Sequence, residues 1–133
     1  MKSLGIQLIV ELYGCNRALL DEPNHSERIL VEAVNRSGAT VIQPFFHQFS
    51  PHGVSGVVVI AESHVAIHTW PEYGYCAVDI FTCGSQVNPD LICEHIRTEF
   101  EAQKISVMEL KRGTLDLPDG ELRHKPMETA QAV

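Results

Sequence analysis

Apolar residues recur along this chain with two spacings, one typical of β-strands and the other of amphipathic helices. The first run, GIQLIVELY at Gly5–Tyr13, is β-branched and apolar on both faces, which predicts a buried strand. Apolar runs of strand length predict further strands at Thr40–Phe49, Val57–Ala61, His64–Trp70, Tyr75–Cys83 and Ile105–Arg112.

Two segments show the helical spacing. Asn24 or Ser26 is a suitable N-cap for a helix that runs to about Asn35, and Asn88-Pro89 is a strong start signal for a second helix. The apolar stripes expected to face the core are Ile29, Leu30, Ala33 and Val34 in the first helix and Leu91, Ile92, Cys93, Ile96 and Phe100 in the second.

The resulting order, β-α-β-β-β-β-α-β, is typical of an α+β fold. It predicts a two-layer sandwich in which a mainly antiparallel sheet is covered on one face by two helices. Strands that are apolar on both sides would leave the second face partly apolar, which favours a homodimer formed sheet-on-sheet or edge-on-edge. Residues 1–133 are expected to form a single domain, with residues 114–133, which are mostly polar, as a loose tail.

Composition narrows the function. The chain has 10 Lys and Arg against 17 Asp and Glu, a net charge of -7. This balance argues against a nucleic-acid partner and is mildly consistent with a cationic ligand. No apolar run reaches the length of a membrane span and no signal peptide is recognised, so no membrane partner is expected. The four cysteines lack CxxC spacing and are interpreted as reduced thiols of a cytoplasmic protein, with a disulfide as the less favoured alternative.

Glu62-Ser63 is an unusual pair to find between two strand-like runs, VVVIA and HVAIHTW. Tight hairpins favour Asn-Gly, Asp-Gly or Gly-X, because these residues tolerate positive φ. The ordinary interpretation of Ser63 is a turn serine. The alternative is that its hydroxyl attacks the preceding carbonyl carbon in a strained turn. The resulting ester would break the chain by β-elimination.

His68 is a candidate acid or base for this chemistry, but it lies five residues beyond Ser63. Five residues of strand span roughly 16 Å, so His68 cannot reach Ser63 along a straight strand and would need a bend or delivery by a partner strand. A hydrogen-bonded structural histidine is the ordinary alternative. A metal site could in principle be built from His47, His52, His64 and His68, but no ligand motif supports it, and no metal is expected.

Cys83 ends a predicted strand, on the face that also carries Asp79 and Phe81. Taken alone, it is more often a buried core thiol than a catalytic one. The aromatic residues are likewise core by default, although Trp70 beside Pro71 is typical of a pocket wall.

The run GVSGVVVIAESHVAIHTWPEYGYCAVDIFTCG at Gly53–Gly84 is identified as similar to the prokaryotic pyruvoyl-dependent S-adenosylmethionine decarboxylases, the short bacterial and archaeal type. The flanking segments LIVELYGC at Leu8–Cys15, FHQFSPHGVSG at Phe46–Gly56 and VMELKRG at Val107–Gly113 agree. The resemblance extends from about Leu4 to Gly113.

The resemblance implies that the Glu62–Ser63 bond cleaves itself and that Ser63 becomes a covalent pyruvoyl cofactor. His68 and Ser55 match residues of this processing, and Cys83 matches the family's catalytic cysteine. The products would be a β chain of residues 1–62 and an α chain of residues 63–133.

The resemblance also implies the substrate. Phe49 and Trp70 match aromatic walls of the adenine site, Glu72 matches the acid that holds the ribose hydroxyls, and Glu11 matches a carboxylate near the active site. Decarboxylated S-adenosylmethionine, the aminopropyl donor for spermidine, would be the product. Two alternatives stay open: the same chemistry on arginine or ornithine, and an uncleaved binding module. Cys76 departs from the pattern, because relatives often have a small residue there.

Overall fold

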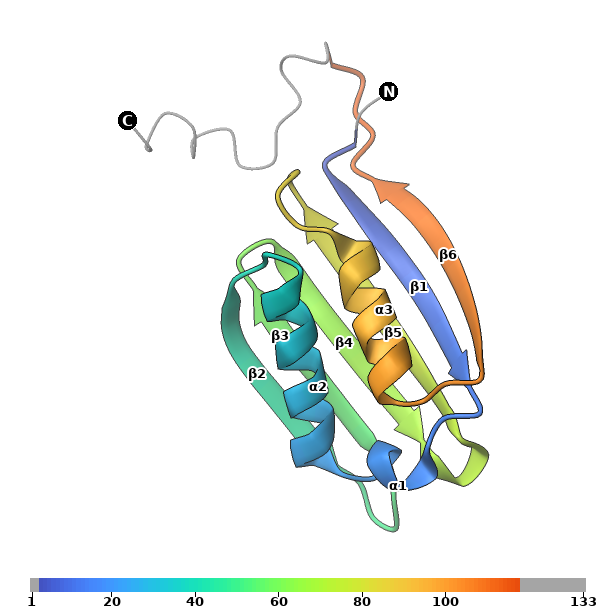
Figure 1. Ribbon diagram of the computed structural model, residues 1–133. Coiled ribbons are helices and arrows are strands. Elements are labelled where there is room, and N and C mark those ends of the chain that lie inside the picture. Colours follow the sequence, from blue (N-terminus) through green and yellow to red (C-terminus); the bar gives the residue numbers. More distant parts are fainter. Residues whose placement is uncertain (1–2, 118–133) are drawn as a thin grey trace.

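The computed structural model describes residues 3–117, which form one antiparallel six-stranded sheet with helices on one side (Figure 1). The strand order is β2-β3-β4-β5-β1-β6. In chain order the elements are β1 (Gly5–Tyr13), α1 (Arg17–Leu20), α2 (Pro23–Arg36), β2 (Val41–Gln48), β3 (Val54–Ile60), β4 (Ser63–Trp70), the 3₁₀ turn η1 (Pro71–Tyr73), β5 (Tyr75–Cys83), α3 (Pro89–Glu99) and β6 (Lys104–Arg112).

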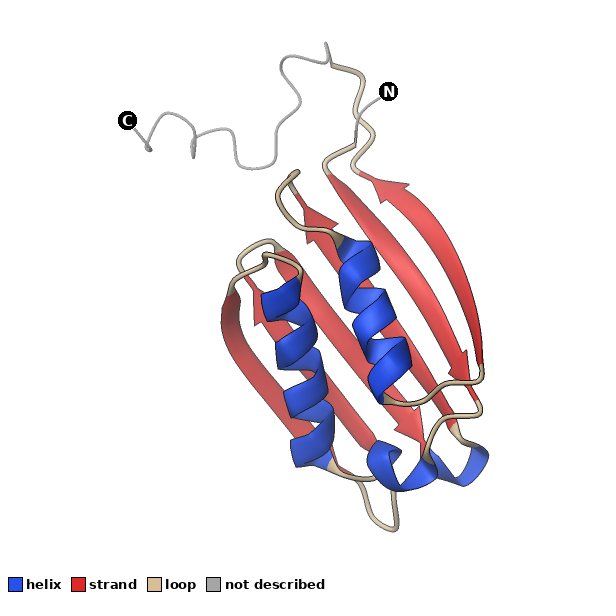
Figure 2. Ribbon diagram, in the orientation of Figure 1, coloured by secondary structure: helices blue, strands red, loops and turns tan. Residues whose placement is uncertain are grey.

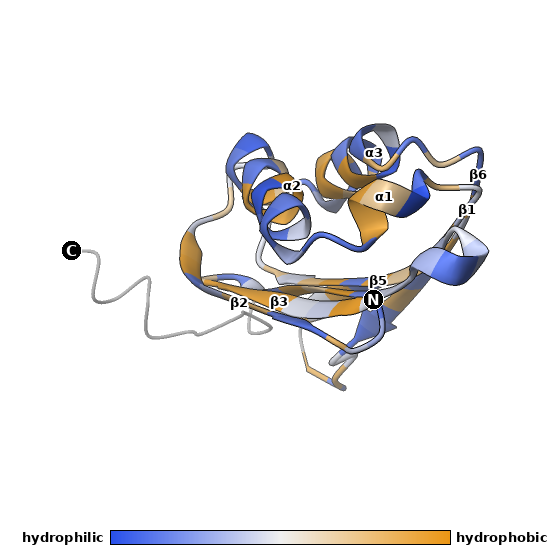
Figure 3. Ribbon diagram, turned by 90° about the horizontal axis from the view of Figure 1, so that it is seen from below, coloured by the Kyte–Doolittle hydropathy of each residue, from blue (hydrophilic) through white to orange (hydrophobic). Residues whose placement is uncertain are grey.

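The predicted two-layer α+β sandwich is confirmed. Helices α2 and α3 lie side by side over one face of the sheet (Figure 2), and their apolar sides point towards it (Figure 3). The opposite face has no helix over it within the described residues, and we call it the open face. No described helix has the length and apolar character needed to span a membrane.

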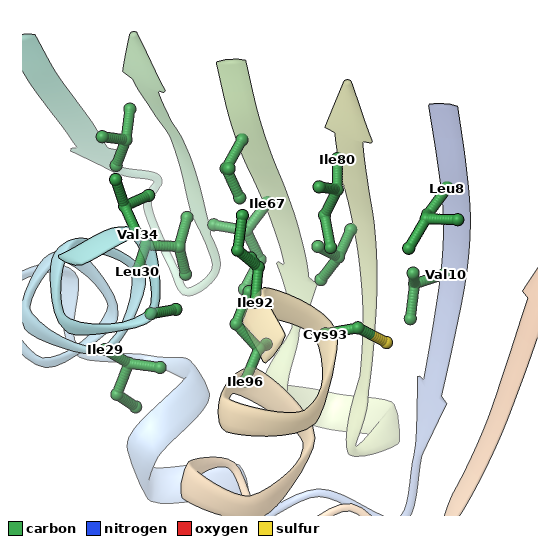
Figure 4. Packing of buried hydrophobic residues seen from close by; sticks show 14 of the residues in the cluster. Leu8, Val10, Ile29, Leu30, Val34, Ile67, Ile80, Ile92, Cys93 and Ile96 are labelled. Atoms are coloured by element: carbon green, nitrogen blue, oxygen red, sulfur yellow. The ribbon is translucent and has the colours of Figure 1, made fainter. Parts of the chain in front are cut away.

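The core lies between the sheet and the helices (Figure 4). Alternate strand residues such as Leu8, Ile67 and Ile80 point into it, as the two-residue period of a strand requires. The predicted stripe of α2 packs against them, and so do Ile92 and Ile96 of α3. Leu91 was also predicted to be buried, which is wrong: it is 47% exposed, because it lies on the outer side of α3.

The helix start signals had mixed outcomes. Asn88 caps α3 as predicted, its side-chain oxygen accepting a hydrogen bond from the Asp90 N–H at 3.0 Å. Neither predicted cap of α2 is used, because the helix starts earlier, with Pro23 in its first turn, and Ser26 is buried within it. The short elements α1 and η1 were not predicted, since four and three residues are too few to show a period.

The β3–β4 hairpin differs from its prediction in two ways. Strand β3 starts at Val54, so Ser55 is a strand residue and not part of a loop. The two turn residues are Ala61 and Glu62, while Ser63 is the first residue of β4 and pairs with Ile60. Ala61 was assigned to the strand because it is apolar.

The open face is partly apolar, as predicted. Phe45 of β2, Val59 of β3 and Met108 of β6 are exposed, and all three have the strand register of this face. Beyond β6, residues 113–117 form no helix or strand. The rest of the predicted tail, 118–133, lies outside the described residues.

Candidate active site

Ser63 has a strained backbone. Its φ of 143° is positive, a region of the backbone map that residues with a side chain rarely adopt. Such a conformation costs on the order of 1–3 kcal/mol and persists only when its surroundings enforce it. Here the enforcement comes from strand pairing on both sides, to Ile60 of β3 and to Thr82 of β5.

The carbonyl group before Ser63 is also held in place. The Glu62 carbonyl oxygen accepts a hydrogen bond from the Cys83 backbone N–H at 2.9 Å. The Glu62 side chain accepts a second one, from the Thr40 N–H at 3.2 Å. A donor on the carbonyl oxygen stabilises negative charge there when a nucleophile attacks the carbon. The arrangement therefore suits attack on the Glu62–Ser63 peptide bond.

Cys83 lies beside this bond and is buried. Gly5 of β1 pairs with it, and a Cβ added to Gly5 would lie 2.9 Å from the Cys83 Sγ and 2.7 Å from a ring carbon of Phe81. Phe81 and Cys83 therefore share one face of β5, as predicted. The missing side chain of Gly5 makes room for the thiol at this end of the sheet.

A pocket of about 390 Å³ lies at the other end of β4. Five predicted site residues line it: Phe49, Ser55, His68, Trp70 and Glu72. Two of them are joined directly, because Ser55 and His68 are cross-strand neighbours and their Oγ and Nδ1 atoms are 2.9 Å apart. The pocket thus combines a Ser–His pair with two aromatic rings and a carboxylate.

Glu72 has a partner in this pocket. The His52 Nε2 lies 3.1 Å from a carboxylate oxygen of Glu72, and both side chains are partly exposed. Asp21, just after α1, fixes the loop that carries His52, since its carboxylate accepts a hydrogen bond from the Gly53 N–H at 2.8 Å. Sequence reasoning considered His52 only as a possible metal ligand, and it missed both the pairing of His52 with Glu72 and the contact of Asp21. The SPHG motif that contains His52 was the available signal, whereas the contact of Asp21 is purely tertiary.

Glu11 lies on β1, in the same row of the sheet as His68, with Ala77 between them. Its carboxylate accepts a hydrogen bond from the Tyr75 hydroxyl. Burial, followed by the hydrogen bond and charge of Glu11, raises the pKa of Tyr75 well above its ordinary value, so the phenol stays a donor. The Tyr75 ring lies 5.4 Å from that of Trp70, which links Glu11 to the pocket.

Within one chain these residues form two separate groups. The hairpin group contains Glu62, Ser63 and Cys83, while His68 belongs to the pocket group. The described chain joins Ser63 and His68 by one continuous strand, whose rise of about 3.3 Å per residue places them roughly 16 Å apart. The pairing of β4 with β3 is unbroken from Ser63 to His68, as this separation requires. The departure at Cys76 affects neither group, because this side chain is buried in the core.

An antiparallel sheet with helices on one face and reactive groups at both ends of one hairpin defines a class of α+β protein with a two-part site. The chain belongs to the S-adenosylmethionine decarboxylase family, whose model matches residues 6–113. It is 51% identical to the S-adenosylmethionine decarboxylase proenzyme of Acetivibrio thermocellus over 89% of this chain and 95% of that protein. It is 46% identical to the proenzyme of Acidithiobacillus ferrooxidans, over 95% and 97% of the two chains.

A solved structure supports the same assignment. The crystal structure of the adenosylmethionine decarboxylase from Aquifex aeolicus superposes with a TM-score of 0.83 at 34% identity. The match covers 90% of this chain and 98% of that one. The likeness therefore extends over nearly the whole fold, including the sheet on which both groups lie.

Proposed function

We propose that this protein is a self-cleaving, pyruvoyl-dependent decarboxylase that converts S-adenosylmethionine to decarboxylated S-adenosylmethionine, the aminopropyl donor for spermidine. The observation that carries the proposal is the positive φ of Ser63, next to a carbonyl that is already hydrogen-bonded, in a chain whose relatives are named proenzymes. A strained residue next to a polarised carbonyl favours an acyl shift.

Processing would proceed in balanced steps. The Ser63 Oγ attacks the Glu62 carbonyl carbon, and the Cys83 N–H stabilises the oxyanion. The hydroxyl proton passes to the Ser63 nitrogen as the amide bond breaks, which leaves an ester and a free Ser63 amine. Removal of the Ser63 α-proton then expels the Glu62 carboxylate and leaves dehydroalanine. Its tautomer, an imine, reacts with water and releases ammonia, so that residues 63–133 begin with a pyruvoyl group and residues 1–62 end with Glu62.

In decarboxylation, the pyruvoyl group supplies a ketone that condenses with the substrate amine and accepts the electron pair released with carbon dioxide. The described residues at this position fit such a group, because the proton-bearing Cys83 lies beside residue 63, with its backbone N–H 2.9 Å from the Glu62 carbonyl oxygen. Cys83 would then deliver a proton to the α-carbon, the role of a general acid. The hairpin group would thus serve both the cleavage and the turnover.

The pocket group would bind the nucleoside. Phe49 and Trp70 are 49% and 41% exposed, so their rings have free surface for adenine and for the sulfonium cation. Glu72 offers a carboxylate to the ribose hydroxyls, and Glu11 adds a negative charge at the edge of the site. Arginine or ornithine would leave the aromatic walls unused, which favours S-adenosylmethionine.

We further propose that the enzyme is a homodimer of cleaved pairs that pack through their open faces. A two-fold axis makes each surface contact its counterpart reciprocally, so one subunit's pocket can meet the other's hairpin. His68 of the partner subunit would then supply the base that Ser63 lacks in its own chain. Burial of the exposed apolar residues of the open face would stabilise the pair.

The cytoplasm is the compartment that this proposal implies. All four cysteines are buried thiols, and an oxidising compartment would put Cys83 at risk. The net charge of -7 disfavours a nucleic-acid partner.

Two measurements on purified protein test the function. Intact mass should show fragments 1–62 and 63–133, the second carrying a pyruvoyl group. The same preparation should release carbon dioxide faster from carboxyl-labelled S-adenosylmethionine than from arginine or ornithine. A stable full-length chain with intact Ser63 would contradict the enzyme proposal, whereas faster release from an amino acid would contradict only the substrate.

A further inference from the structure

Three side chains capable of binding a metal ion converge between α2 and α3. Glu32 comes from α2, and His95 and Glu99 come from α3, one helical turn apart. One ligand atom from each residue lies within 4.8 Å of the other two. Within residues 3–117, no other set of three His, Cys, Asp or Glu side chains comes this close together.

His95 is the unusual member of this group. Its side chain is only 8% exposed, and its Nε2 is buried without a hydrogen-bond partner among the described residues. Buried polar atoms are nearly always satisfied, so this nitrogen calls for an explanation. The nearest acid atom is the Glu32 Oε2, 3.3 Å away, but the contact lacks hydrogen-bond geometry. The nitrogen therefore lies within ion-pair distance of the Glu32 carboxylate but makes no hydrogen bond to it.

A metal ion would satisfy all three groups. Ligand atoms 2.0–2.1 Å from a tetrahedral ion lie about 3.3 Å apart, the spacing already seen between His95 and Glu32. Glu99 is partly exposed and would complete the set by a change of side-chain torsion. An adjoining pocket of about 230 Å³, lined by His95 and Glu99, gives access to the ion and to water.

The surrounding charges orient the site. Arg28 donates to the other oxygen of Glu32, Oε1, at 2.9 Å and so holds the carboxylate with Oε2 towards His95. Outer contacts of this kind orient the ligands of metal sites. Glu94 also lines the pocket, but its carboxylate is paired with Arg97, so it is not one of the ligands.

We propose that Glu32, His95 and Glu99 form a site for a divalent transition metal of the zinc class, with water as the remaining ligand. One imidazole nitrogen and two carboxylates suit Zn²⁺ or Co²⁺, whereas Mg²⁺ and Ca²⁺ prefer oxygen ligands alone. The ion would tie α2 to α3 on the layer that covers the sheet. It lies away from the open face, so the site does not depend on the proposed decarboxylase activity.

The test uses the full-length protein as purified, stripped with a chelator and titrated with Zn²⁺. We expect one ion per chain by calorimetry and a rise in Tm of about 5 °C under saturating Zn²⁺. Mg²⁺ should produce no comparable rise. The Co²⁺ form should show ligand-field bands without the near-ultraviolet absorption of a thiolate ligand, which separates this site from the cysteines.

Variants locate the ion. His95→Gln and Glu99→Gln should each weaken Zn²⁺ binding at least tenfold and remove the rise in Tm. Glu94→Gln is the matched control on the same helix and should bind as tightly as the parent. Glu99 is partly exposed, so Glu99→Gln should fold even if His95→Gln does not. Equal Zn²⁺ affinity in Glu99→Gln and the parent, or a thiolate signal with Co²⁺, would overturn the proposal.

Discussion

The hairpin group and the pocket group lie on strands of one sheet, but they are built differently. At the hairpin, the distinctive features belong to the backbone: a positive φ at Ser63 and a carbonyl of Glu62 held by a backbone N–H. In the pocket, side chains such as Trp70 and Glu72 are partly exposed and available to a ligand. In the proposed function the first region reacts with its own chain, and the second binds the substrate.

The difference also shows what each region lacks. The hairpin has a nucleophile and an oxyanion donor, but His68 lies at the far end of β4. In the pocket, the His68 Nδ1 lies 2.9 Å from the Ser55 Oγ, but the Glu62–Ser63 bond is at the other end of the strand. A two-fold dimer would join the two halves, and the predictions below separate their contributions.

The largest effect is expected from Ser63→Ala, which removes the nucleophile. The chain should stay uncut and inactive, because no other hydroxyl is attached to the strained residue. Intact mass measures this directly. Ser85→Ala, on the turn after β5, is the control and should cleave at the parental rate. Cleavage of Ser63→Ala at the same bond would show that the hairpin is not self-processing.

Loss of His68, which belongs to the pocket group, should slow cleavage at the hairpin. Removing a general base typically costs about 10²–10⁴-fold in rate, so His68→Ala should process slowly and accumulate an ester that hydroxylamine opens. Co-expression with Ser63→Ala sharpens the comparison. If His68 of the partner subunit serves Ser63, mixed dimers should cleave the His68→Ala chain, whose serine is intact.

The matched controls are the two variants expressed separately, each of which should stay largely uncut. Mixed dimers that form but do not cleave would mean that His68 acts within its own chain. A parental cleavage rate in His68→Ala alone would remove its role in processing.

Cys83→Ala separates the two functions of the hairpin group. The backbone N–H that holds the Glu62 carbonyl remains, so processing should continue. Decarboxylation should fall by about 10²–10⁴-fold, because the proton donor is lost. Carbon dioxide release measures turnover, and borohydride should still trap substrate on the variant. Unchanged turnover would assign the proton to another group.

The sequence predicts features that depend on neighbouring residues better than features that depend on contacts between distant segments. Burial with a fixed period is local, so the strand at Gly5–Tyr13 and the stripe of α2 were found with their boundaries nearly right. The rise per strand residue was also enough to predict that Ser63 and His68 lie far apart within one chain. Asp21, the His52–Glu72 pair and the Glu32–His95–Glu99 cluster were missed, because each depends on contacts between segments distant in the sequence.

The turn shows a different limit. Ala61 is apolar and was assigned to the strand, which moved the turn by one residue. The sequence still predicted strain at Glu62-Ser63, because the pair lacks the glycine that a tight turn favours. The value of φ itself comes from pairing with both β3 and β5, and no local pattern contains that information.

The smallest effects are expected inside the pocket, where we expect His52 to act on the substrate only through Glu72, its ion-pair partner. Glu72→Gln removes a charged hydrogen bond worth about 1.5–3 kcal/mol, so KM for S-adenosylmethionine should rise about 10- to 150-fold. His52→Ala removes a partly exposed ion pair worth about 0.2–1 kcal/mol, so KM should rise no more than about fivefold, with kcat unchanged. Adding His52→Ala to Glu72→Gln should change KM little further, because the carboxylate that His52 positions is already gone.

These KM values, measured on fully cleaved enzyme, form a double-mutant cycle. Additive effects would show that His52 contacts the substrate itself, and a large fall in kcat with His52→Ala would place it nearer the hairpin chemistry than the pocket geometry indicates.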